Sequence, residues 1–187
     1  GFPQHGIEAI RSFVGNGVRK LIERAVPQGT ENPLFEEVFR TFKEHYVAHC
    51  RDHSGLYAGI SEMLQALADS GYRLAVVSNK LQAGVTELQQ YYFSSWIQVA
   101  VGERPEVRRK PAPDMVLQAV NELGADLRET VYVGDSDVDI ETARQCGIPC
   151  ISVLWGFRDR DFLESCGATH FAATPQDIVT FIQKGLE

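Results

Sequence analysis

The chain has 187 residues, of which 44% are hydrophobic and 23% are charged, and its formal net charge is −7 at pH 7. This composition is typical of a globular protein with a substantial core, either one domain or a core with a small accessory domain. The acidic balance argues against non-specific binding to nucleic acid, which needs a basic surface. No apolar run approaches the length that crosses a membrane, so we expect no membrane partner.

The first 54 residues contain helical patterns. Apolar residues recur at helical spacing over residues 7–14, 17–26 and 33–50. Pro33 suits the first turn of the third helix, where its missing N–H is not needed. The aromatic residues of that helix are expected to form the core of a small helical bundle: Phe35, Phe39 and Phe42.

From residue 55 onward, helices alternate with short apolar strands. A helix over Ile60–Ser70 ends at Gly71, and the last helix runs from Pro175 towards Lys184. The strands are predicted at residues 73–78, 97–101, 130–134, 149–153 and 169–172. This alternation predicts an α/β fold with a Rossmann-like, three-layer core, a parallel sheet covered by helices on both faces.

The four cysteines form no C-x-x-C pair: Cys50, Cys146, Cys150 and Cys166. A chain of this size needs no disulfide framework. Its N-terminus shows no signal pattern. We therefore expect reduced thiols and a cytoplasmic location.

Two polar clusters fall where ligands bind an open parallel sheet, beyond the carboxyl ends of its strands. The first is Ser78-Asn79, whose hydroxyl and backbone amide can hold a phosphate oxygen, although these residues taken alone favour a helix N-cap. The second is Lys110, which a proline on its carboxyl side makes a rigidly delivered charge for a phosphoryl group. A solvated basic loop is the alternative for Lys110.

The third cluster carries the strongest signal. A buried strand ends at Gly134 and is followed by Asp135, Asp137 and Asp139. Carboxylates this close repel one another unless a cation offsets them, and Mg²⁺ is their natural partner beside a phosphate. An acidic helix N-terminus is the alternative, which suits Asp137 better than Asp135 or Asp139.

Together these clusters resemble the haloacid dehalogenase superfamily. Its second motif is matched by Ser78, its third by Lys110-Pro111, and its fourth, Gly-Asp-x-x-x-Asp, by Gly134-Asp135 and Asp139. The resemblance is closest to phosphoglycolate-phosphatase-like members, through two further segments. These are Val14-Gly15-Asn16-Gly17 and Leu56-Tyr57-Ala58-Gly59, where Ala58 replaces a common proline.

The resemblance implies Mg²⁺-dependent hydrolysis of a small phosphorylated metabolite through an aspartyl-phosphate intermediate. Asp135 would bind Mg²⁺, and Ser78 with the amide of Asn79 would bind a phosphate oxygen. Lys110 would stabilise nucleophile and phosphate, and Asp139 would orient Lys110 or the waters of the metal. Residues 1–54 would be a helical cap, and residues 55–187 the α/β core.

The first motif of the superfamily, Asp-x-Asp-Gly-Thr, supplies the nucleophile on the first strand, and this chain does not contain it. None of its three Asp-x-Asp sequences, which begin at Asp135, Asp137 and Asp159, is followed by Gly-Thr. We therefore hypothesise that the nucleophile lies on a preceding segment, that the core lacks its first strand, and that these residues alone are inactive.

The alternative is a non-catalytic phosphate-binding or interaction module. A receiver domain fits less well, because its acidic cluster comes early and its lysine comes last.

Two further features are given structural interpretations. His45, His49 and His53 recur every four residues and could align for zinc, but a solvated stripe is favoured. Trp155-Gly156-Phe157 is expected to pack a loop near the site and to take no part in the chemistry.

Overall fold

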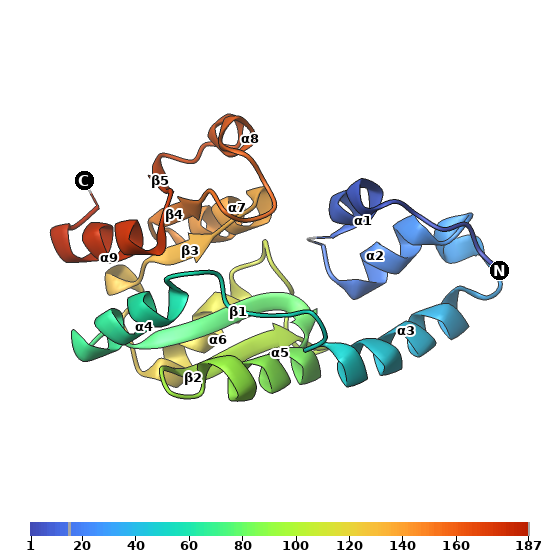
Figure 1. The fold of residues 1–187 in the computed structure, drawn as a ribbon, viewed down its shortest axis with the longest axis horizontal. Coiled ribbons are helices and arrows are strands. Elements are labelled where there is room, and N and C mark those ends of the chain that lie inside the picture. Colours follow the sequence, from blue (N-terminus) through green and yellow to red (C-terminus); the bar gives the residue numbers. More distant parts are fainter. Residues whose placement is uncertain (15, 187) are drawn as a thin grey trace.

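Three helices form the N-terminal part of the molecule and confirm the helical prediction. The computed structural model describes residues 1–14 and 16–186, so Gly15 of the predicted Val14–Gly17 segment lies outside the described residues. The helices are α1 (Ile7–Phe13), α2 (Val18–Ala25) and α3 (Phe35–His49). Figure 1 shows them at one end of the molecule, with the strands at the other.

Phe35 is the centre of the core of these helices. Its side chain is 1% exposed and packs with buried aliphatic residues of α2 and the segment that follows, namely Val18, Ile22 and Val26. Phe39 and Phe42 pack against the same cluster, which confirms the predicted aromatic core. Leu81, at the end of the first strand, also contacts this cluster and so connects the helices to the α/β part.

The predicted position of Pro33 is wrong. The third helix begins at Phe35 with Leu34 as its N-cap, so Pro33 lies in the preceding turn. Asn32 stabilises that turn, because its side-chain oxygen accepts the N–H of Leu34 at 2.9 Å. An Asx turn thus takes the place that the sequence suggested for the first helical turn.

The rest of the chain alternates helices and strands. After α4 (Ile60–Asp69) come β1 (Leu74–Leu81), β2 (Ile97–Glu103), β3 (Tyr132–Gly134), β4 (Cys150–Val153) and β5 (His170–Ala172). The helices among them are α5 (Gln82–Leu88), α6 (Asp114–Leu123), α7 (Asp137–Cys146), α8 (Arg160–Ser165) and α9 (Pro175–Lys184). The named strands pair in parallel, which confirms the α/β class. The division into residues 1–54 and 55–187 stays a prediction.

The strands form two hydrogen-bonded groups, ordered β1-β2 and β3-β4-β5. In the first group, Val76 and Val77 of β1 pair with Ala100 and Val101 of β2. In the second, β4 is central and pairs with β3 on one side and β5 on the other. The two strands at the facing edges, β1 and β3, are not paired with each other. Figure 1 shows β3 above β1.

A cavity of about 710 Å³ lies between β1 and β3. Its walls include residues 74–77 of β1, residues 131–133 at the start of β3, and apolar side chains from α4, α6 and α9. Backbone groups at a strand edge need hydrogen-bond partners, and a sheet interior is normally filled to near-crystalline density. β1 and β3 thus face each other across this cavity without pairing.

The four cysteines are free, as predicted. Cys50 is buried and Cys166 is exposed, while burial raises the pKa of the Cys150 thiol to about 12. Within the described residues, no helix is both long and apolar enough to cross a membrane.

Candidate active site

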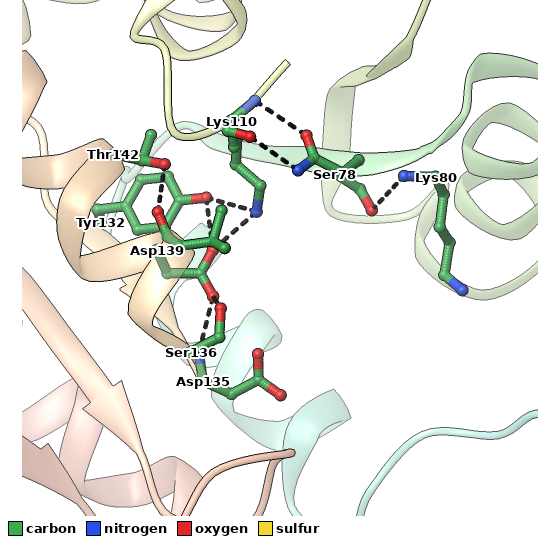
Figure 2. A network of polar contacts seen from close by, with 10 residues as sticks. Ser78, Lys80, Lys110, Tyr132, Asp135, Ser136, Asp139 and Thr142 are labelled. Atoms are coloured by element: carbon green, nitrogen blue, oxygen red, sulfur yellow. Dashed lines mark hydrogen bonds and ion pairs between the residues drawn. The ribbon is translucent and has the colours of Figure 1, made fainter. Parts of the chain in front are cut away.

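The carboxyl ends of the strands bring the predicted site residues together around one cavity. Ser78 lies on β1, Lys110 on the loop after β2, Asp135 directly after β3 and Asp139 in the first turn of α7. All four line a cavity of about 260 Å³, to which the N-terminal helices contribute a wall. Figure 2 shows the polar network at its base.

An ion pair between Lys110 and Asp139 is the centre of this network. Lys110 Nζ lies 2.7 Å from Asp139 Oδ1, and the two side chains are only 11% and 7% exposed. The basic-loop interpretation of Lys110 is therefore wrong, because this ammonium points into the protein. Burial acts to raise the pKa of Asp139, but Lys110 and hydrogen bonds from Ser136 and the Asp135 amide outweigh it and lower that pKa.

Two hydroxyl groups complete the environment of Asp139. Tyr132, buried on β3, donates from its phenol to Asp139 Oδ1 at 3.1 Å and accepts from Lys110 Nζ at 3.0 Å. Ser136 donates to Asp139 Oδ2 at 2.6 Å. Burial, then the charge of Asp139, raises the pKa of Tyr132 well above its ordinary value, so the phenol remains a donor. Figure 2 shows Lys110, Tyr132 and Ser136 converging on this carboxylate.

Sequence reasoning missed Tyr132 and Ser136. The available signal for Tyr132 was a tyrosine in a buried strand, because a buried phenol normally needs a hydrogen-bond partner. For Ser136 it was the position before an acidic helix, since serine is favoured as an N-cap. Its hydroxyl instead bonds to the Asp139 side chain, and α7 begins without a side-chain cap from Ser136.

Asn79 fixes the loop that carries Lys110. Its side-chain Oδ1 accepts the backbone N–H of Lys110 at 2.9 Å, and its Nδ2 donates to the carbonyl of Lys110 at 3.0 Å. This reciprocal pair connects β1 to a loop 31 residues away. The sequence pointed to the backbone amide of Asn79, whereas the structure gives its side chain a positioning role.

Ser78 is not a helix cap, so that alternative is wrong. The strand β1 extends to Leu81, which is itself the N-cap of α5. The hydroxyl of Ser78 accepts the N–H of Lys80 at 3.2 Å, which aligns it at the cavity wall. A hydroxyl there remains able to donate to a bound ligand.

The turn at Trp155-Gly156-Phe157, which was predicted to pack near the site, holds Asp135. The backbone N–H of Phe157 donates to Asp135 Oδ2 at 2.9 Å. Gly156 permits this approach, because a Cβ on it would lie 2.2 Å from the Asp135 Cβ. Burial, followed by the nearby charge of Asp139, raises the pKa of Asp135 above its ordinary value. A cation beside Asp135 would offset both effects.

Gly134 has the same role toward Asp139. A Cβ at Gly134 would lie 2.3 Å from the Asp139 Cβ, which leaves no space for a side chain. Asp137, the first residue of α7, pairs with Arg158, with Nε and Oδ1 3.6 Å apart. This position matches its predicted role at an acidic helix N-terminus.

The histidine stripe does not form the zinc site that was considered. The rings of His45 and His49 stack at 4.3 Å, but α3 ends at His49, and His53 has a φ of 56° outside the helix. His49 instead contacts Asp52, with Nδ1 and Oδ2 2.7 Å apart. The described residues contain no group of three or more histidine, cysteine or acidic side chains arranged for a metal.

Magnesium places a smaller demand on the protein. It is commonly bound through one or two carboxylates, with water and substrate phosphate completing its shell. Asp135 meets that demand, because its carboxylate lines the same cavity as Ser78 and Lys110. The residues therefore fit a magnesium ion at Asp135.

Comparison with known proteins places this geometry in a family. The model of the haloacid dehalogenase-like hydrolases matches residues 1–153. A phosphoglycolate phosphatase of Aquifex aeolicus is 30% identical, over 84% of this chain and 72% of the relative. An N-acetylmuramic acid 6-phosphate phosphatase of Pseudomonas aeruginosa is 27% identical, over all of this chain and 83% of the relative.

A solved structure supports the same placement. The crystal structure of a candidate phosphoglycolate phosphatase from Lactobacillus delbrueckii superposes with a TM-score of 0.88. It is 34% identical, and the match covers 96% of this chain and 84% of that one. The fold is thus shared with that protein.

Gly156→Ala is expected to disturb the site directly. Because the new Cβ would overlap Asp135, we expect a loss of about 1–3 kcal/mol in the free energy of unfolding, measured by urea denaturation. Gly55→Ala is the control, since no atom lies within 4 Å of a Cβ there. Equal stabilities of the two variants would contradict the packing described for the Phe157 turn.

Tyr132→Phe tests the buried phenol. The variant keeps the ring but removes the hydrogen bond that the phenol donates to Asp139 and the one that it accepts from Lys110. Because both partners are charged, the free energy of unfolding should fall by about 1.5–3 kcal/mol. Tyr57→Phe makes the same chemical change at a side chain that is 61% exposed and should have little effect. An unchanged urea midpoint for Tyr132→Phe would show that the phenol does not stabilise Asp139.

Proposed function

We propose that this chain, which belongs to the haloacid dehalogenase-like hydrolases, hydrolyses a small phosphate monoester with Mg²⁺, because its relatives include phosphatases. Phosphoglycolate is the first candidate substrate, since relatives that share its fold carry that activity in their names. The observation that carries the proposal is the buried Lys110–Asp139 pair beside Asp135 and Ser78 in one cavity. We also propose a cytoplasmic location.

Ser78, the amide of Asn79 and Lys110 would bind the phosphoryl group. Ser78 on β1 and Lys110 on the loop after β2 both line the cavity, and the side chain of Asn79 bonds this strand to that loop. Such donors act well when they are fixed before the substrate arrives, because no reorganisation is then needed as charge develops. Asp139 would hold the Lys110 ammonium in place and aim it at the phosphate.

Asp135 would hold the magnesium ion. When bound, Mg²⁺ neutralises negative charge on the transferring phosphoryl group. The turn at Gly156-Phe157 would keep the Asp135 carboxylate at the cavity, through the N–H of Phe157. This arrangement leaves Asp139 to the lysine and Asp135 to the metal.

The nucleophile is proposed to lie on an extended segment between β1 and β3. The cavity of about 710 Å³ separates these strands, and their carboxyl ends carry Ser78 and lead to Asp135. A parallel strand in that space would therefore end between the phosphate donors and the proposed metal ligand. We expect that segment to lie outside the 187 residues and these residues alone to be inactive.

The reaction would proceed in two displacements. The nucleophilic carboxylate would bond to phosphorus while the ester oxygen leaves and takes a proton from an acid on the same segment. Water would then attack the aspartyl-phosphate and release phosphate and the free carboxylate. Residues 1–54 are proposed to act as a cap that excludes bulk water during these steps.

Asp135→Asn is expected to abolish Mg²⁺-dependent turnover in the natural protein, because it removes the charge of the proposed ligand. A loss of at least about 100-fold in kcat/KM is expected from steady-state assays with phosphoglycolate. Asp69→Asn is the control, since Asp69 is exposed at the end of α4. Full activity of Asp135→Asn would remove Asp135 from the site.

Trapping the intermediate would locate the nucleophile. The natural protein, quenched during turnover and reduced with borohydride, should contain homoserine in place of one aspartate. Peptide mass mapping should place that residue outside residues 1–187. A homoserine at any aspartate inside this chain would disprove the proposed nucleophile segment, and turnover without any covalent intermediate would favour a different mechanism.

A further inference from the structure

Lys80 is a cation of the cavity wall that the proposed reaction does not use. It lies on β1 two residues after Ser78, and both residues line the cavity of about 260 Å³. Figure 2 shows the Lys80 side chain across an open space from Asp135 and Ser136. Its ammonium donates to the phenol oxygen of Tyr46 at 2.8 Å.

The other charges of the cavity are balanced within the protein. Asp139 pairs with Lys110, and Asp137 pairs with Arg158. Arg11 pairs with Glu8 at 3.8 Å near the solvent. Asp135 is assigned to the metal.

Lys80 differs from these cations. Lys80 is exposed and takes part in none of the ion pairs among the described residues, and its ammonium donates to a phenol. A cation at the wall of a small cavity attracts an anionic group of the ligand. Because Lys110 and the metal already serve the transferred phosphoryl group, the anion that Lys80 fits lies elsewhere on the substrate.

Tyr46 holds this ammonium from the helical part of the molecule. Its ring packs on α5 at Gly84, where an added Cβ would lie 3.2 Å from the ring. The ring also lies 5.4 Å from the Lys80 ammonium, measured to its centroid. A phenol that accepts from Lys80 fixes the direction of the charge without neutralising it.

We propose that Lys80 binds a carboxylate on the leaving-group side of the substrate and that Tyr46 positions its ammonium. The inference rests on the proposed function and narrows it to short phosphate esters that carry a second anionic group. The cavity of about 260 Å³ is smaller than the pockets of about 300–1,000 Å³ that bind drug-sized ligands, which agrees with a short ester. Lys80 is thus the specificity-determining residue, and Tyr46 is a positioning residue.

The test compares three esters of similar length in the natural protein with Mg²⁺. Phosphoglycolate carries a carboxylate, ethyl phosphate is neutral at that end, and phosphoethanolamine is cationic. Lys80→Met should lower kcat/KM for phosphoglycolate by about 10–100-fold, as expected for a lost hydrogen bond to a charged group. Turnover of ethyl phosphate should change by less than about threefold, since it lacks the carboxylate.

Two further variants separate specificity from structure. Lys80→Glu should reverse the preference towards phosphoethanolamine, which a general loss of folding cannot do. Tyr46→Phe should raise KM for phosphoglycolate while leaving KM for ethyl phosphate unchanged. Lys184→Met, on the exposed end of α9, is the control for removing a lysine charge.

The outcomes distinguish this inference from the function on which it rests. Equal losses for all three esters in Lys80→Met would overturn the inference, because Lys80 would then serve the shared phosphate. Equal turnover of the three esters by the unaltered protein would also overturn it. No Mg²⁺-dependent turnover of any ester by the unaltered protein would instead disprove the proposed function, and the inference with it.

Discussion

The buried ion pair between Lys110 and Asp139 is the constraint on which the site depends. Two charges that are 11% and 7% exposed are stable only if they neutralise each other and their remaining hydrogen-bonding positions are filled. Tyr132, Ser136 and the Asp135 amide fill those positions. Removing one charge would leave the other buried without a partner, at a cost of about 3–5 kcal/mol.

This constraint reaches beyond the pair itself. Asp139 can approach β3 only because Gly134 has no side chain. The lysine loop stays in place because the side chain of Asn79 bonds to both the backbone N–H and the backbone carbonyl of Lys110. Residues of β1, β3, α7 and the loop before α6 therefore share one network. The network holds together strands that do not pair with each other, β1 and β3, at the edge of the cavity between them.

The fold was largely predictable from sequence because its signals are local. The last helix, predicted from Pro175 towards Lys184, is observed as α9 with those bounds. The strands followed from short apolar runs between helices. Pro33 was misplaced because an Asx turn at Asn32, which depends on one side-chain hydrogen bond, delays α3 by two residues.

The site was less predictable, because its geometry depends on contacts between distant segments. Spacing identified Lys110, Asp135 and Asp139, but it could not show that Lys110 is buried or that Asn79 acts through its side chain. Tyr132 carries no motif, and only its neighbours reveal its role. Likewise, a four-residue repeat of histidines aligned His45 and His49, but the helix ended before His53.

The strand β1 carries the residues proposed for two tasks, binding of the phosphoryl group and binding of the rest of the substrate. Ser78 and Lys80 both line the cavity, and the side chain of Asn79 between them bonds to the lysine loop. Under the proposed roles, one short segment would present a hydroxyl to the phosphoryl group and a cation to the rest of the ligand. Because Tyr46 reaches Lys80 from α3, the position of the helical part also sets the direction of that cation. Recognition of the leaving group would then depend on contact between the two parts of the chain, whereas the phosphate donors stay fixed within one.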